Sequence, residues 1–118
     1  MWDRNLEYIH IPESVQYIAY GAFENTGLKN IVIPRSFTYI PQEAFYNTSL
    51  INVTMFNGIE TIGESAFRGC KYLETINSSV SGEYILPNTI TKLDGSVFYD
   101  CEKLKYIKLS KNNVSIGN

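Results

Sequence analysis

The sequence predicts a repeat solenoid, and three features of the chain indicate this fold. One pattern recurs about every 22 residues, in copies at residues 6–27, 28–49, 50–72 and 73–103, with a partial copy at 104–118. Each full copy opens with an alternating apolar pattern and later carries a small residue followed by phenylalanine. A unit of this size cannot bury its apolar face alone, so successive units stack around a continuous core. We therefore expect one solenoid domain over residues 1–118.

The opening pattern of each copy, L-x-x-I-x-I, predicts a short strand. Alternation of apolar and other residues, with many β-branched side chains, is typical of a strand that buries one face. Because the copies stack, these strands should form a parallel sheet. The apolar positions are Leu6, Ile9 and Ile11; Leu28, Ile31 and Ile33; Leu50, Val53 and Met55; Leu73, Ile76 and Leu86; and Leu104, Ile107 and Leu109.

The rest of each copy predicts a turn, a second short extended segment and a short helical turn. Proline or a substitute follows the strand, and a small polar residue or glycine follows two positions later, which indicates a turn. The second extended segment contributes apolar residues such as Val15 and Ile18. Two positions after each phenylalanine stands Asn, Gly or Asp, types that tolerate a left-handed backbone at the end of a helical turn. The rings should stack in one internal column of Phe23, Phe45, Phe67 and Phe98.

The fourth copy carries eight extra residues at 77–84, with the sequence NSSVSGEY. Insertions in solenoids commonly become loops that leave the coil on the binding side. We expect a hairpin-like excursion with Ser81 and Gly82 at its tip. Sequence drift in a tolerant loop is the alternative interpretation.

The two cysteines, Cys70 and Cys101, occupy the place that Thr26 and Thr48 hold in the first two copies. A position that also accepts threonine is chosen for size, so we expect free thiols in the core. Stacked coils lie about 4.8 Å apart, a separation that would also permit a disulfide.

The repeated string I-P-x-S-V-x-x-I-x-x-x-A-F, followed by Cys or Thr and the next Leu, resembles the BspA-type leucine-rich repeat. The stretch IGESAFRGC at residues 62–70 is nearest to that pattern, and Pro41, Phe56 and Asp94 depart from it at turn positions. The resemblance covers essentially the whole chain. It implies a leucine-rich repeat solenoid with its strands on the concave side. It also implies a non-catalytic module that binds proteins, typically in a cell-surface or secreted adhesion protein that contacts host matrix proteins or other cells. The family has no fixed functional residues.

Composition and motifs argue against several other function classes. A net charge of −2 does not suit nucleic acid or an anionic membrane. No run approaches the roughly 20 apolar residues of a membrane span. His10 is the sole histidine, and the chain has no zinc-type Cys/His spacing and no glycine-rich phosphate motif. We therefore expect no catalytic, cofactor or metal site.

The predicted contact surface is the set of side chains that project outward from the coils. Tyrosines in this set could anchor a partner, since tyrosine gives a large contact area at low entropy cost. The alternative is that they cover apolar edges of neighbouring coils. The strip should be roughly 20–25 Å long, which suits a modest protein interface or a short glycan. The strand positions are Tyr8, His10, Asn30, Val32, Asn52, Thr54, Thr75, Tyr106 and Lys108; Tyr17 and Tyr39 follow the turn, and Ser81 and Gly82 belong to the insertion.

Three functional hypotheses follow. The first is a protein-binding module of a cell-surface or secreted protein, in which case the chain is part of a longer one. The second is a small cytoplasmic protein that binds and inhibits a single partner, which Met1 as the true start would favour. The third is a glycan binder that uses the tyrosines. Solenoid ends need caps, and Trp2 is the sole candidate lid, so we also expect self-association through uncapped ends or a place in a longer array.

Overall fold

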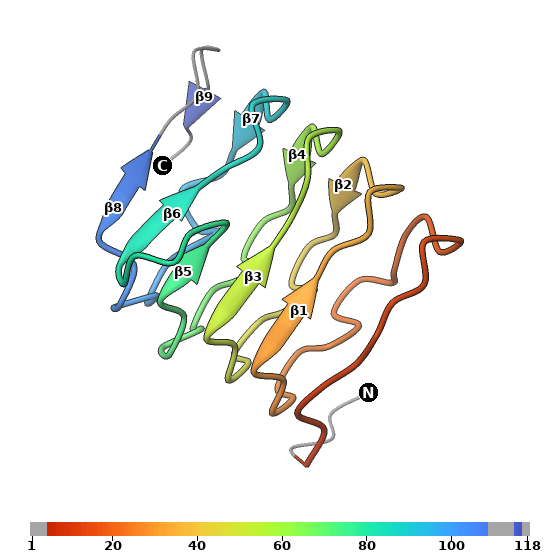
Figure 1. Ribbon diagram of the computed structural model, residues 1–118, viewed down its shortest axis with the longest axis horizontal. Coiled ribbons are helices and arrows are strands. Elements are labelled where there is room, and N and C mark those ends of the chain that lie inside the picture. The colour runs from red at the N-terminus through yellow and green to blue at the C-terminus, as the bar shows by residue number, and fades with distance from the viewer. Residues whose placement is uncertain (1–4, 109–114, 117–118) are drawn as a thin grey trace.

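The computed structural model describes residues 5–108 and 115–116, which form a β-solenoid (Figure 1). The strands of each sheet lie side by side in successive coils, and every pairing is parallel. The first sheet has the order β1 (Asn30–Val32), β3 (Asn52–Thr54), β5 (Thr75–Ile76), β6 (Glu83–Ile85) and β8 (Tyr106–Lys108). The second sheet has the order β2 (Tyr39–Ile40), β4 (Thr61–Ile62), β7 (Lys92–Leu93) and β9 (Ser115–Ile116). The repeat solenoid predicted from the sequence is confirmed.

The strand register superimposes equivalent residues of successive copies. Ile31 pairs with Val53 in the first sheet, and Val53 pairs with Ile76. All three side chains are buried in the core between the sheets. The period of the sequence therefore sets the register, because a slip by one residue would turn each apolar side chain to the solvent face.

The phenylalanines form the internal column that the sequence predicts. Successive ring centroids lie 5.7, 5.2 and 5.8 Å apart, with 10°, 8° and 13° between ring planes, from Phe23 through Phe45 and Phe67 to Phe98. The two inner rings are fully buried. Aromatic side chains bury the largest area per residue, so this column contributes much of the core.

The segments around these rings are consecutive turns, not the short helical turns expected from the sequence; residues 5–108 contain no helix. The amide of Phe45 donates to the carbonyl of Ala66, one coil on, at 2.8 Å. The next amide, of Tyr46, instead donates to Glu43 within its own coil at 3.2 Å. A helix would direct all its amides along its own axis. Here positive φ angles, such as 56° at Glu43, alternate the direction of the amides and join the coils.

The eight-residue insertion adds a strand to the first sheet and does not leave the coil as a hairpin-like loop. Tyr84 in β6 pairs with Ile76 on one side and Ile107 on the other. The carbonyl of Gly82 accepts the amides of Lys105 at 2.7 Å and Tyr106 at 2.8 Å. The second sheet gains no matching strand, so the insertion widens the first sheet alone by one spacing of about 4.8 Å. Concave placement of the first sheet stays a prediction.

Asn77 directs the chain from β5 into this extra strand. Its φ is 56°, a left-handed conformation that asparagine tolerates better than most residues. Its side-chain oxygen accepts the amide of Met55, and its side-chain nitrogen donates to the carbonyl of Ile85, each at 2.9 Å. One side chain thus bonds to the residue that follows β3 and to the last residue of β6.

The first coil is attached to the second mainly through its phenylalanine side. The amides of Phe23 and Asn25 donate to carbonyls of the second coil at 2.9 and 2.8 Å. The strand predicted at residues 6–11 is extended but unpaired: among the described residues, no backbone hydrogen bond joins residues 8–11 to β1. The amide of Lys29 donates to Glu7 at 2.9 Å, and beyond this bond the two segments separate. Trp2 and Leu109 lie outside the described residues.

Candidate functional site

The outward face of the first sheet carries most of the predicted contact residues. Tyr8 and Tyr106 are 65% and 62% exposed, and His10, Asn30, Val32, Asn52 and Lys108 are exposed as well. Thr54 is half-buried. Thr75 is buried, and therefore does not project into solvent as its strand position predicts. The face is thus open at both ends of the sheet and partly closed in the middle.

A ladder of polar side chains explains the closed middle. The side-chain nitrogen of Asn52 donates to the side-chain oxygen of Asn30 at 3.0 Å, and the hydroxyl of Thr75 donates to the side-chain oxygen of Asn52 at 2.7 Å. These bonds connect three coils and satisfy the groups that point outward. Cross-strand pairs of this kind stabilise a sheet, so the middle of the face has a structural use.

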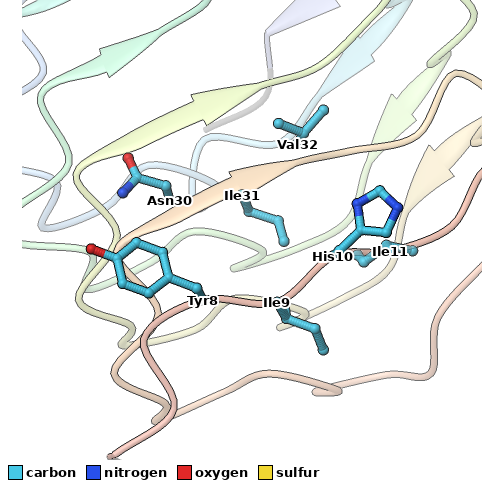
Figure 2. A pocket seen from close by; sticks show the side chains of 7 residues that line it. All are labelled: Tyr8, Ile9, His10, Ile11, Asn30, Ile31 and Val32. Atoms are coloured by element: carbon cyan, nitrogen blue, oxygen red, sulfur yellow. The ribbon is translucent and has the colours of Figure 1, made fainter.

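A shallow hollow of about 190 Å³ lies at the seam between residues 8–11 and β1 (Figure 2). Its lining is Tyr8, Ile9, His10, Ile11, Asn30, Ile31 and Val32. Four of these residues, Tyr8, His10, Asn30 and Val32, are predicted contact residues, and the structure brings them together. The hollow exists because the first coil does not pair with β1, which a repeating sequence pattern does not reveal.

A second hollow of about 190 Å³ continues along the same seam. It shares His10, Ile11 and Val32 with the first hollow and adds Glu13 and Pro34. The carboxylate of Glu13 accepts the amide of Arg35 at 2.9 Å, which fixes this end of the seam. We call the two hollows together, lined by residues 8–11, 13, 30–32 and 34, the seam groove. An aromatic ring, aliphatic side chains, an imidazole and an amide meet there.

The other predicted contact residues lie elsewhere. Tyr17 and Tyr39 are exposed on the side of the second sheet, where they occupy the same position in adjacent coils. Ser81 is exposed and donates to Glu74 at 3.2 Å, whereas Gly82 is buried. These residues therefore do not form a single surface with the seam groove.

A mixed-charge hollow of about 370 Å³ was not predicted from the sequence. It lies where the chain enters the first sheet, and Lys29 on its wall forms an ion pair of 3.3 Å with Glu7. The sequence does contain a signal for this hollow, because each residue that lines it stands directly before or after the leucine that opens a copy. Its lining is Lys29, Ser49, Ile51, Tyr72, Glu74 and Lys103.

Two pairs of titratable side chains form hydrogen bonds that shift a pKa. Tyr20, exposed and also missed by the sequence analysis, donates its hydroxyl to Glu43, and this bond raises the pKa of the tyrosine. Cys70 and Cys101 are free and buried. The pKa of the Cys101 thiol is raised by its hydrogen bond with Cys70 and by burial, so this thiol stays protonated. Over the described ranges, no group of three or more His, Cys, Asp or Glu side chains is arranged to hold a metal ion.

Comparison with known proteins gives one family match. The family model described as the BspA type leucine-rich repeat region, with six copies, matches residues 1–118. Neither the comparison with curated proteins nor that with solved structures gives a match. In the part of the chain that the structure describes, no helix is long and apolar enough to cross a membrane. Since the family match spans the whole chain and the coils repeat as it requires, the chain belongs to the BspA-type leucine-rich repeat family.

Proposed function

We propose that the chain is a non-catalytic module that binds another protein through the seam groove. The observation that supports this proposal is an apolar surface left open on an otherwise polar face. Ile9 and Val32 are exposed beside Tyr8 in the groove. Exposed aliphatic and aromatic side chains next to a few polar groups are typical of protein-binding surfaces.

The groove also offers backbone groups. A parallel strand directs its donors and acceptors to both neighbours, and β1 pairs with β3 on one side only. A partner segment could therefore bind β1 by main-chain hydrogen bonds while its side chains enter the hollows. We also propose that the module belongs to a cell-surface or secreted adhesion protein that binds extracellular matrix proteins, and the resemblance to the family supports this.

The experiment is a binding assay of the chain against a panel of immobilised extracellular matrix proteins. Val32→Lys puts a charge into the groove without removing a core side chain, and it should weaken binding at least tenfold, which corresponds to about 1.4 kcal/mol. Tyr39→Ala, on the second sheet, is the matched control and should bind as the wild type does. Equal binding by Val32→Lys and the wild type would place the contact surface elsewhere.

A glycan is the second candidate ligand, and the arrangement of Tyr8 and Asn30 favours it. An aromatic ring and an amide line the same hollow, so a sugar ring could stack on one and hydrogen bond to the other. Saturable binding on a carbohydrate array that is lost in Tyr8→Ala would support this ligand. Binding to no sugar on the array would favour the protein partner.

A further inference from the structure

Both ends of the described solenoid expose a residue of one row of core side chains, the row that holds the second apolar position of each L-x-x-I-x-I pattern. Ile31, Val53 and Ile76 are 3%, 2% and 0% exposed in the inner coils. Ile9 in the first coil and Ile107 in the last are 38% and 37% exposed. All five hold the same position of the repeat. Ile107 has a neighbouring coil on one side only, and Ile9 at the other end also lines the hollow beside β1. Another coil of the same pattern would bury both ends.

The charged residues at the two ends are complementary. Residues 5–27 contain three glutamates, Glu7, Glu13 and Glu24, and no Lys or Arg. Residues 104–108 contain Lys105 and Lys108 and no acidic residue. Opposite charge on two surfaces favours their encounter and discourages contact between two like ends. The two ends therefore suit each other better than either suits itself.

The two ends also have complementary residues at equivalent positions of the repeat. Glu7, Lys29 and Lys105 occupy the same place in their copies, one residue after the opening leucine. Within the chain, Glu7 and Lys29 of adjacent coils already form an ion pair of 3.3 Å. A last coil stacked on a first coil with the repeat's own spacing would place Lys105 beside Glu7 in the same way. At the next two positions it would place Tyr106 beside Tyr8, and Ile107 beside Ile9.

We propose that the chain associates head to tail with a second copy of itself, the last coil of one copy stacking on the first coil of the next. The described residues leave the strand edges free for such a contact, because β8 pairs only with β6 and residues 8–11 belong to no strand. A head-to-tail contact is heterologous, so further copies add in the same direction and form short linear oligomers. Tyr8 and Ile9 belong to both surfaces, because they line the seam groove and also stand at the open end of the first coil.

The test is a charge-swap complementation followed by sedimentation velocity at low ionic strength. The wild type should shift from monomer to dimer and larger species as its concentration rises. Glu7→Lys and Lys105→Glu should each remain monomeric at the same concentrations, because each places two like charges at the contact. An equimolar mixture of the two variants should associate again, since every contact between different variants pairs a lysine with a glutamate.

Restored association in the mixture cannot arise from a folding defect in either variant. The matched controls are Glu64→Lys and Lys71→Glu, which make the same charge changes at exposed positions away from both ends, and these should associate as the wild type does. At about 1 M salt, where screening acts within roughly 3 Å, association of the wild type should weaken. A wild type that stays monomeric, single variants that associate normally, or a mixture that stays monomeric would each overturn the proposal. Val32→Lys should leave association unchanged, which separates this proposal from the seam groove.

Discussion

The rings of Phe45 and Phe67 stack with their centroids 5.2 Å apart and 8° between their planes, although 22 residues separate them in the sequence. Both side chains are 0% exposed. The backbone supports the same contact, because the amide of Phe45 donates to Ala66 and that of Phe67 to Val97. Ring stacking and the backbone hydrogen bonds between the turns of successive coils therefore act together to hold the coils in register.

Truncation of an inner ring should cost more stability than truncation of an outer ring. Phe45→Ala leaves a cavity between two neighbouring rings, and we expect a loss of about 3–5 kcal/mol in the free energy of unfolding. Phe23→Ala, at the open end of the column, should cost clearly less because this ring is only partly buried. Urea denaturation of the three proteins measures both values. Equal losses in the free energy of unfolding would show that a ring inside the column contributes no more to stability than a ring at its end.

The sequence predicts most of the fold because the repeat itself encodes the packing. Residues at one position of the repeat, such as Ile31 and Val53, must superimpose for either to be buried. The helical turns were predicted wrongly for a physical reason. Residues tolerant of a left-handed backbone end helices, but they also permit alternating turns, and only the hydrogen bonds to the next coil distinguish the two.

The insertion and the seam groove depend on contacts that the pattern does not contain. Serines at 78, 79 and 81 suggest a loop, yet the stretch that begins at Glu83 pairs with β8 and so forms a strand. The first coil carries the same pattern as the others, so the sequence predicts the same pairing there. Its separation from β1 therefore could not be predicted, although the residues that line the resulting hollow were.

Asn77 should be among the least replaceable residues of the insertion. Asn77→Gly keeps the left-handed φ but loses hydrogen bonds to Met55 and Ile85, and we expect a loss of about 1–3 kcal/mol. Asn77→Ala should cost a further 1–2 kcal/mol or so, because alanine disfavours this backbone conformation. In thermal and urea unfolding, the wild type should be the most stable protein, Asn77→Gly the next and Asn77→Ala the least stable. Equal stability of the alanine and glycine variants would show that the left-handed backbone at residue 77 does not affect stability.

The buried thiols should react only when the chain opens. Cys70 donates to the carbonyl of Phe45 at 3.2 Å and Cys101 to that of Phe67 at 3.0 Å, so both sulfurs are held inside the core. A thiol reagent such as DTNB should modify neither in the folded chain and both in urea, because both sulfurs are buried. The raised pKa of Cys101 also keeps that thiol out of the reactive thiolate form. Burial alone protects Cys70, because its desolvation is outweighed by its hydrogen bonds with Cys101 and Thr48, which lower its pKa. Fast modification of the native chain would contradict this arrangement.

Replacement of Cys70 tests why the position accepts both threonine and cysteine. Thr48 holds the same position one coil earlier, with its hydroxyl 3.1 Å from the sulfur of Cys70. Cys70→Thr keeps a small side chain that can donate a hydrogen bond and should be nearly as stable as the wild type. Cys70→Leu overfills the site and should cost about 1–3 kcal/mol. A leucine variant as stable as the threonine variant would indicate free volume beside Cys70.

Asp94 should give the stability a measurable dependence on pH. Its carboxylate accepts the hydroxyl of Ser96 at 2.7 Å and the amide of Ser96 at 2.8 Å, and these bonds lower the pKa of Asp94 from its ordinary value of 3.8. A group whose pKa is lower in the folded chain than in the unfolded chain stabilises the fold above the unfolded value. That contribution is lost as the pH falls through the folded value.

The comparison with Asp94→Asn isolates this one group, because both proteins share all other titrating residues. At neutral pH the wild type should be the more stable of the two, since a charged acceptor forms the stronger hydrogen bonds. The difference should shrink as the pH falls from 3.8 through the lower folded pKa of Asp94, below which the aspartic acid is neutral and resembles the amide. Urea unfolding over a pH series measures the difference, and NMR titration of the Asp94 carboxyl gives its pKa directly. A stability difference that stays constant through the acid range would show that the bonds to Ser96 do not favour the ionised form.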